Sequence, residues 1–558
     1  MPPPLRITIA GGGIAGLTAA LRLAERGCRV RVYEQKRVLG GDLGSRRGHG
    51  DAELDVYPHM YCNWYRNFWR LHADVTGQPR EARFAPFDGY KQLARGDFPH
   101  FTGVTDMYSP WHALENTFSG VGPPADMYVF GYASLDLLAE RLVRTMRLSD
   151  VSVSAFLNSR PYMTKRAAAA YDTFITRVWG IPSYLTAADD FRQYLSFAMA
   201  DPTPAFWLPR GSAQREVIAP LTRALEERGV EIRRTTQVVG VSCAGGRIRE
   251  ITLRRSRLDA AKTNWVPTGE SWDDSDFDEL VLAVPPLQLV RLLRSGDRGQ
   301  RLVEAAPALA EISRLRSVQV PIINLYFTRK LRQIPAEPVG LLNSRLCLAF
   351  TDISQTQTDV ADFAGRTVLA VSASDVYALP GTGAADDAQA MLTELARYLE
   401  FDPGRAWGES PDIDWTRTRY EPNLDAQLFV NETGSDDWRP EPEFPAIDNL
   451  VFAGDYTNNH VGMTTIESAV TSGLQAANAI VRSHRLGAPV EIAKPPFTLA
   501  HELLWVWYRY ALAPYAAAAS AWSWGTDASD GLIARLVRGS AALRRQVARA
   551  QRRDSWRT

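Results

Sequence analysis

The most constraining feature of the sequence is a glycine-rich turn near the N-terminus, within LRITIAGGGIAGLTAALRLAERG. Residues 5–10 are an apolar run typical of a buried parallel strand, and residues 17–26 have the hydrophobic spacing of a helix packed on a sheet. Between them, Gly11, Gly13 and Gly16 form the pattern GxGxxG. These glycines permit a tight turn, close approach of the backbone to a pyrophosphate, and close helix–strand packing. The sequence therefore predicts a nucleotide bound at the N-terminus of this helix.

A second strand, predicted over residues 29–33, ends at Glu34. In dinucleotide-binding folds, an acidic residue about 20 residues beyond the glycines accepts a hydrogen bond from a ribose hydroxyl. The same carboxylate would repel a 2′-phosphate, which argues against NADP and leaves FAD and NAD as candidates. A glycine-rich turn without a ligand is the structural alternative, but the combination of strand, glycines, helix, strand and acid favours nucleotide binding.

A second strand-to-helix turn, near the other end of the chain, separates FAD from NAD. The segment NLVFAGDYTNNHVGMTTIESAVTSGLQAANAI predicts a short strand, a turn at Gly454 and Asp455, a loop and a helix. Such a turn brings another helix N-terminus and a carboxylate to the same cofactor, and FAD is long enough to reach both. The stretches FAGDYT and TIESAVTSG resemble the flavin-closing motif of flavin-containing amine oxidases and carotenoid desaturases. The resemblance implies that Asp455 contacts the ribityl chain and that the helix start at Thr465 and Ile466 faces the flavin pyrimidine.

Two further segments are similar to zeta-carotene and plant-type phytoene desaturases. The stretch LDVYPHMYCNWYRNFWRLHADVTG contains their pattern of an acid, a His, an aromatic cluster and a Tyr-x-Asn. These positions are Asp55, His59, Tyr61, Tyr65 and Asn67. The stretch FWLPRGSAQREVIAPLTRALEERGVEIRRTTQVVGV is similar to the segment that leads into the adenine-contacting strand, which implies Val238 as the adenine neighbour.

The resemblance implies non-covalent FAD, because no Cys or His occupies a position that matches a covalent flavin link. The implied cofactor-binding residues are Gly11, Gly13, Ile14, Ala15, Gly16, Glu34, Gln35, Gly41, Ser45, Arg46, Pro58, His59, Val238, Gly454, Asp455, Thr465 and Ile466. The sequence departs from the family at Asp42, where a Lys or Arg usually follows Gly40 and Gly41. Because the usual cation beside the pyrophosphate is absent, Arg46 or Arg47 is expected to replace it.

The chemistry that the resemblance implies is dehydrogenation of a carbon–carbon bond, in which hydride leaves one carbon for the flavin and the neighbouring carbon loses a proton. His59 and His460 are the candidate proton acceptors, since imidazole titrates near neutral pH. The structural alternative, which we favour, is that His59 hydrogen-bonds near FAD and His460 caps a loop. Candidate substrate contacts are Tyr57, which replaces a family glycine, and Phe206 and Trp207, which lie on a proline-bounded loop. No metal site is expected.

The order of the motifs predicts an α/β fold. A Rossmann-type FAD-binding domain is assembled from discontinuous segments, an α+β substrate domain is interleaved with it, and a helical extension follows at the C-terminus. The expected segments are 1–75, 205–290 and 445–485 for the FAD-binding domain, 76–204 and 291–444 for the substrate domain, and 486–558 for the extension. The active site is expected between the two domains. The polar, turn-rich residues 256–277 are expected to form an excursion between two strands.

Three classes of function, together with a redox-neutral variant of the flavin enzymes, fit these motifs. The first is a FAD-dependent desaturase of a carotenoid, another isoprenoid or a lipid, with either quinone or oxygen as the electron acceptor. The second is an amine oxidase, which is disfavoured because Thr465 stands where that family usually has a Tyr of its aromatic cage. A redox-neutral flavin-dependent isomerase or hydratase of lipids shares the fold and stays open. The third is a non-catalytic escort-type binding protein, against which the retained glycine motifs, Glu34 and Asp455 argue.

Composition and charge narrow the remaining classes. The 558 residues include 63 basic and 63 acidic side chains, so no overall positive field would attract nucleic acid. The four cysteines include no CxxC pair, which argues against a zinc site or a disulfide framework and favours the cytoplasm. No secretion signal and no stretch of about 18 uncharged apolar residues is found.

The predicted extension combines aromatic and basic residues. Its aromatic part contains Trp505, Trp507, Trp522 and Trp524 and is interrupted by Pro514, and residues 532–553 carry seven arginines and an apolar stripe. A basic amphipathic helix that follows interfacial aromatics suits the anionic inner face of a membrane, to which the protein would bind peripherally. A helix packed on the FAD-binding domain or on a dimer partner fits almost equally well.

Overall fold

The N-terminal glycine turn belongs to a five-stranded parallel sheet. The computed structural model describes residues 3–94, 100–105, 114, 116–201, 204–260, 264–495 and 499–554. The sheet has the order β10-β2-β1-β14-β22, and every neighbouring pair is parallel. Its strands are β1 (Arg6–Ala10), β2 (Arg29–Tyr33), β10 (Glu231–Arg233), β14 (Glu279–Leu282) and β22 (Leu450–Phe452). Strands from separate parts of the chain therefore build one Rossmann-type sheet.

Two helices with closely approaching backbones pack beside this sheet. They are α1 (Ile14–Ala24) and α13 (Ile466–Ser483), which contact one another. A Cβ atom at Gly16 would lie 2.2 Å from the carbonyl oxygen of Gly11, and one at Gly473 would lie 2.4 Å from the carbonyl oxygen of Ala15. Glycine at these two positions therefore lets α1 approach both its own strand and α13.

The polar segment expected to be an excursion between strands contains a strand of its own. Trp265–Asp274 form β13, which pairs antiparallel with β12 (Arg247–Leu258), and β12 pairs with β11 (Thr236–Ala244). Most β13 side chains are exposed or half-buried. A strand at the solvated edge of a sheet has little hydrophobic alternation, so the sequence pattern did not identify it.

A second, seven-stranded sheet combines residues from two distant parts of the chain, in the order β20-β16-β19-β18-β17-β7-β8. Its strands are β7 (Gly89–Ala94), β8 (His100–Thr105), β16 (Ile322–Tyr326), β17 (Val339–Leu341), β18 (Leu348–Asp352), β19 (Val368–Ala373) and β20 (Arg419–Glu421). A helical layer lies beside it, formed by α4 (Pro124–Val143), α5 (Val153–Asn158), α6 (Lys165–Trp179) and α7 (Ala188–Ala200). Within that layer α4 contacts α6 and α7, and α6 contacts β17. The residue boundaries of the two expected domains stay a prediction.

Shorter elements connect these parts. The remaining strands are β3 (Ser45–Arg47), β4 (Glu53–Asp55), β5 (Tyr61–Cys62), β6 (Phe84–Phe87), β9 (Phe206–Pro209), β15 (Ser317–Val318) and β21 (Leu428–Phe429). The remaining helices up to residue 483 are α2 (Arg66–Thr76), α8 (Ala219–Glu227), α9 (Pro286–Leu293), α10 (Gly296–Ala305), α11 (Ile353–Thr356) and α12 (Ala384–Leu395).

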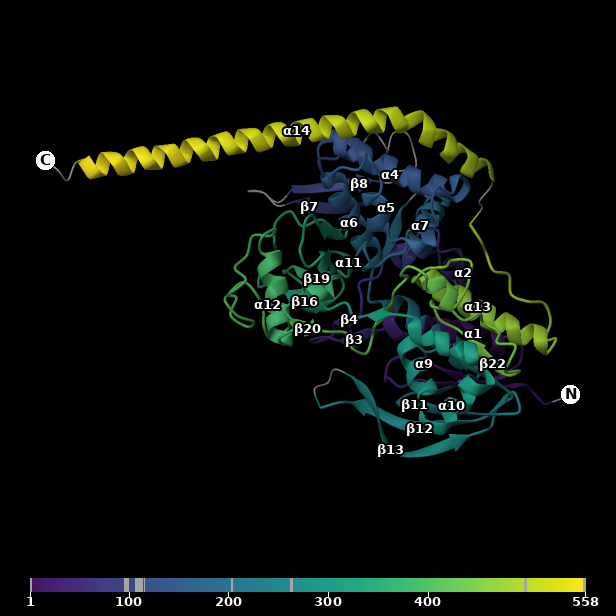
Figure 1. Ribbon diagram of the computed structural model, residues 1–558. Helices are drawn as coiled ribbons and strands as arrows, with labels where there is room; N and C mark the ends of the chain where they lie inside the picture. Colours follow the sequence, from purple (N-terminus) through teal and green to yellow (C-terminus); the bar gives the residue numbers. More distant parts are fainter. Residues whose placement is uncertain are drawn as a thin grey trace.

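The C-terminal extension is a single long helix, α14 (Leu499–Asp554), which continues through Pro514 (Figure 1). Its first part packs on α4, and its second part projects beyond the rest of the molecule. Arg509 forms ion pairs with Asp136 at 2.7 Å and with Glu140 at 3.1 Å. Both carboxylates are buried and also pair with Arg160, at 3.0 Å and 2.9 Å. Within the described part of the chain, no helix is long and apolar enough to cross a membrane.

Replacing Arg509 with Met should lower the free energy of unfolding by about 2 to 4 kcal/mol, because two buried carboxylates then share one guanidinium. Urea unfolding followed by tryptophan fluorescence measures the effect. The matched control is Arg147→Met, which removes an exposed pair with Asp150 and should cost less than about 0.5 kcal/mol. Equal destabilisation by the two variants would contradict a role of Arg509 in docking α14.

Candidate active site

One cavity of about 320 Å³ lies where the parallel sheet, the seven-stranded sheet and the helical layer meet. Its wall includes the turn after β1, the end of β2, the turns after β14 and β22, and the first residues of α13. Residues of β16, β18, β19, α6 and α7 complete the wall. The cavity therefore contacts both glycine turns singled out in the sequence.

Most of the expected cofactor residues line this cavity. They are Gly11, Gly13, Ile14, Ala15, Glu34, Gln35, Gly41, Pro58, His59, Val238, Gly454, Asp455, Thr465 and Ile466, together with the expected substrate contact Tyr57. Gly16, Ser45 and Arg46 lie outside the lining, as do His460, Phe206 and Trp207. The binding roles assigned to all these residues stay predictions.

The glycine turn leaves a slot bounded by backbone. Gly13 precedes the first turn of α1, and it bridges to Gly40 as an isolated parallel pair. A Cβ atom at Gly41, which has a φ of 62°, would lie 3.2 Å from the Cα atom of Gly13. The slot between the two turns is therefore free of side chains, and the unpaired N–H groups of α1 open into it.

Glu34 holds the two loops at the end of β1 and β2. Its Oε2 atom accepts a hydrogen bond from the amide of Gly12, and its Oε1 atom accepts one from the amide of Lys36, both at 2.7 Å. Burial raises the pKa of Glu34, although these amides oppose the shift by stabilising the carboxylate. The carboxylate is thus fixed in place at the edge of the cavity, where the sequence predicted a ribose acceptor.

The cavity lining includes a lysine that the sequence did not indicate. Arg46, expected to replace the family cation, instead donates to Asn423 at 2.7 Å and to Asp425 at 3.1 Å, outside the cavity lining. Lys36 lines the cavity, and its Nζ atom lies 3.1 Å from Asp425. The sequence signal that could have identified Lys36 was its position two residues after Glu34, just beyond the strand that ends at the cavity.

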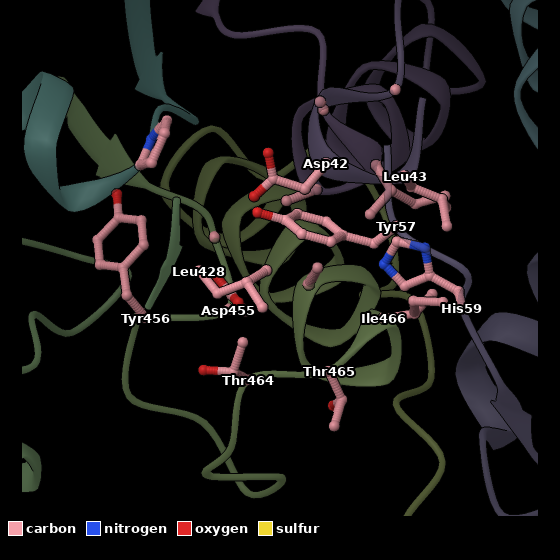
Figure 2. Close-up of a pocket in the computed structure, with 18 of the residues that line it drawn as sticks. Asp42, Leu43, Tyr57, His59, Leu428, Asp455, Tyr456, Thr464, Thr465 and Ile466 are labelled. Carbon is pink, nitrogen blue, oxygen red and sulfur yellow. The ribbon is translucent and has the colours of Figure 1, made fainter. Parts of the chain in front are cut away.

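Carboxylates gather around the middle of the cavity. Figure 2 shows Asp42 beside the hydroxyl of Tyr57, with Asp455 facing the same space. Burial raises the pKa of Asp455 to about 7, with a further contribution from the charge of Asp42. Burial also raises the pKa of Asp42 to about 6, against the opposing charge of Lys36. The Tyr57 hydroxyl donates to the carbonyl oxygen of Ala426, which fixes its ring over this space.

The start of α13 supplies the second helix N-terminus. Thr465 caps the helix, because its hydroxyl accepts a hydrogen bond from the amide of Ser468 at 3.1 Å. Thr465 and Ile466 both line the cavity, so the positive end of the helix dipole faces it (Figure 2). Gly454 precedes this region with a φ of 147°, and a Cβ atom there would lie 2.3 Å from the ring of Tyr456.

The two candidate histidines lie in different places. His59 lines the cavity beside Ile466, and among the described residues its Nδ1 atom has no hydrogen-bond partner (Figure 2). Burial lowers the pKa of His59 to about 4, so the ring is neutral at physiological pH. His460 lies outside the lining, where burial and the charge of Lys494 lower its pKa to about 4. The structure thus brings one of the two histidines to the cavity.

The apolar part of the wall consists largely of residues that the sequence did not single out. Trp179 and Tyr194 come from α6 and α7, and they join Tyr65, which the sequence had placed in the desaturase-like Tyr-x-Asn pattern. Further apolar lining residues are Leu43, Val178, Leu292, Val320, Ile322, Ala349 and Leu428. The expected contact Phe206 instead stacks on Phe87 and Tyr90 in the core. Tryptophans and tyrosines in helices usually pack in cores, so only the tertiary contacts distinguish these lining residues.

The chain belongs to the family of flavin containing amine oxidoreductases, which it matches over residues 14–481. A carotenoid phi-ring synthase from Streptomyces griseus is 25% identical over 509 residues, covering 85% of this chain and 87% of that protein. A 15-cis-phytoene desaturase from Synechococcus elongatus is 24% identical over 504 residues, covering 86% and 96%. The solved structure of cyclohexylamine oxidase from Brevibacterium oxydans aligns with a TM-score of 0.56 at 13% identity, covering 87% and 100%.

These similarities confirm the expected superfamily, the α/β fold and the oxidoreductase class. The family is flavin-containing, and the cavity fits such a group. The slot bounded by Gly13 and Gly41 would allow phosphates to approach the amides of α1, and a second helix N-terminus faces the cavity at Ile466. The buried carboxylate of Glu34 and the half-buried carboxylate of Asp455 both line the cavity and can accept hydrogen bonds from hydroxyl groups.

The raised pKa of Asp455 predicts a pH dependence of stability for the flavin-free protein. The folded protein binds this proton more tightly than the unfolded chain, so the stabilisation is present below about pH 4 and is lost as the pH rises to about 7. When the pH is raised from about 5 to about 7.5, the wild type loses this stabilisation and Asp455→Asn has none to lose. The decrease in melting temperature should therefore be about 2 to 4 °C smaller for Asp455→Asn than for the wild type. Thermal melts at both pH values measure this difference.

The matched control is Asp448→Asn, which changes an exposed aspartate in the same part of the chain. It should reproduce the wild-type pH dependence. If Asp455→Asn also reproduces it, the carboxyl group of Asp455 does not titrate in this range in the folded protein.

Proposed function

We propose that this protein is a FAD-dependent desaturase of a hydrophobic, isoprenoid-like substrate such as a carotenoid. The observation that carries the proposal is a single cavity lined both by the two glycine turns and by an apolar, aromatic wall. Similarity to a 15-cis-phytoene desaturase and to a carotenoid phi-ring synthase supports a substrate of this class.

FAD would extend along the cavity, held by residues at its two ends. Glu34 would accept a hydrogen bond from the adenosine ribose, and Val238 would contact adenine. The amides at Gly13 and Ile14 would bind the pyrophosphate, with Lys36 as the nearby cation. Asp455 would hold the ribityl chain, and the start of α13 at Ile466 would stabilise negative charge on the flavin ring.

We propose that this FAD is held without a covalent bond. Cys62 lines the cavity, but burial raises the pKa of its thiol to about 12. Because the thiolate is the nucleophilic form of cysteine, this side chain is poorly suited to form a link with a flavin.

The reaction would place the substrate carbons against the apolar wall. When bound, FAD supplies the acceptor for the hydride removed from one carbon. The wall formed by Trp179, Tyr194 and Leu428 would orient the chain and exclude water. Although the sequence favoured a structural role for His59, its neutral imidazole lines the cavity with an Nδ1 atom that has no hydrogen-bond partner among the described residues, so it would accept the proton from the neighbouring carbon. Quinone and oxygen both remain candidates for the final electron acceptor.

Other functions are less well supported. An amine oxidase would use an aromatic cage beside the flavin, and Thr464 and Thr465 occupy the approach to α13 in this chain. A redox-neutral isomerase or hydratase would use the same cavity, and it differs in having no net electron transfer. An escort-type binding protein would have no need of the glycine slot or of the buried Glu34 carboxylate.

Substitution of Glu34 should weaken FAD binding. Glu34→Ala should raise the Kd roughly 10- to 150-fold, because a hydrogen bond to a charged group contributes about 1.5 to 3 kcal/mol. Glu34→Gln keeps an acceptor oxygen and should recover part of the loss. Titration of flavin-free protein with FAD, followed by quenching of flavin fluorescence, gives these constants. The control Glu227→Ala changes an exposed residue of α8, and if it weakened binding as much as Glu34→Ala, the ribose role of Glu34 would be wrong.

Anaerobic mixing with candidate substrates tests the reaction class. A polyene substrate should bleach the flavin absorbance band as two electrons enter the cofactor, and amines and unsaturated fatty acids should leave it unchanged. Bleaching by amines alone would favour an amine oxidase. Product formation without bleaching and without an oxidant would favour the isomerase or hydratase.

A further inference from the structure

The solvent-facing side of α14 is built from apolar and aromatic residues. We call this side the outer face, and it comprises the exposed large side chains between residues 499 and 524. The exposed fractions are 62% for Leu499, 55% for Leu503, 45% for Leu504, 62% for Trp507, 37% for Tyr508, 63% for Tyr510, 65% for Tyr515, 71% for Trp522 and 55% for Trp524. The positions between them on the same side are mainly alanine, with Pro514 and Gly525.

The charged residues of this part of α14 lie on the opposite side, against the protein. Glu502 is buried and pairs with Arg141 at 2.9 Å, and Arg509 pairs with the buried Asp136. Besides Glu502 and Arg509, the Asp, Glu, Lys, Arg and His side chains described between residues 499 and 526 include only His501, which is exposed. A helix on a water-soluble protein normally has the reverse arrangement, with its charges toward water and its apolar stripe toward the core.

Several buried contacts hold the helix in this orientation. The hydroxyl of Tyr132 donates to the carbonyl oxygen of Arg509 at 3.0 Å, and the hydroxyl of Ser523 donates to Asp126 at 2.6 Å. Ala516 and Ser520 are buried between these two contacts. Rotation of α14 to hide its outer face would therefore move Arg509 away from its buried carboxylates, at a high cost in free energy. The packing of α14 on α4 therefore keeps the outer face exposed to solvent.

We propose that the outer face of α14 binds the surface of a lipid bilayer and lies in the boundary between headgroups and acyl chains. Trp and Tyr dominate the face, and these side chains favour this boundary because each has an apolar ring and a polar atom. The helix lies on the membrane, since within the described residues no helix is long and apolar enough to cross one.

Charge complementarity indicates that the bilayer bound by the outer face contains anionic lipids. The sequence of the same helix continues with seven arginines and no acidic residue over 532–553, whose side chains lie outside the described residues. Anionic headgroups neutralise such a run. A second copy of the chain would instead add a second arginine-rich run without acids to pair with it.

Flotation of the full-length protein with vesicles tests this surface. Vesicles of phosphatidylcholine with about one third phosphatidylglycerol should carry the wild-type protein upward in a density gradient. The triple variant Leu503→Gln, Trp507→Gln, Trp522→Gln should bind roughly 100-fold more weakly, because three large apolar side chains no longer enter the bilayer. Its flavin absorbance and far-ultraviolet circular dichroism should match the wild type, since the substituted side chains face away from the core.

The matched control replaces three exposed apolar residues elsewhere, Val38→Gln, Leu258→Gln and Tyr377→Gln, at 41%, 41% and 64% exposure. It should bind vesicles within about twofold of the wild type. Quenching of tryptophan fluorescence by brominated lipid should accompany wild-type binding and be largely lost in the α14 triple variant.

Three results would overturn the proposal. The wild type could remain in the vesicle-free fraction, or the α14 triple variant could float as well as the wild type. The wild type could also sediment as a dimer that the triple variant abolishes, without binding to vesicles, and the outer face would then be an interface between two copies.

Discussion

The close approach of α1 to its own strand and to α13 is the contact on which the site depends. Gly16 allows α1 to lie over the Gly11 carbonyl, and Gly473 allows α13 to lie over the Ala15 carbonyl. Because both helices are held this tightly beside the parallel sheet, their N-termini lie at one cavity. Two positive helix ends separated along one cavity suit a long anionic cofactor, and neither turn alone would provide this arrangement.

Three of the side chains that line the cavity are the carboxylates of Glu34, Asp42 and Asp455. Glu34, Asp42 and Asp455 all have a raised pKa, and burial is the largest cause in each case. Nearby cations are mostly committed to other acids, as the pair between Lys36 and Asp425 illustrates. Helix ends and backbone amides, more than arginine or lysine side chains, would therefore compensate the negative charge of the proposed FAD.

The C-terminal helix is connected to the cavity through the helical layer. α14 packs on α4, which contacts α6 and α7, and these two helices contribute Trp179 and Tyr194 to the cavity wall. The proposed membrane surface and the proposed polyene site thus share one structural layer.

Local chemistry explains why the sequence alone determined the Rossmann turn, Glu34, the Gly454 and Asp455 turn and the start of α13. Each depends on short-range constraints, namely a glycine where a Cβ atom would collide, an acid at a strand end and a cap before a helix. The sequence did not reveal β13, Lys36 as the cavity cation, Trp179 and Tyr194 in the wall, or the separation of His59 from His460. These depend on which side chains from distant segments meet, and hydrophobic pattern carries no information about that. The same holds for α14, whose charged side became the inner one only because buried carboxylates on α4 receive Arg509.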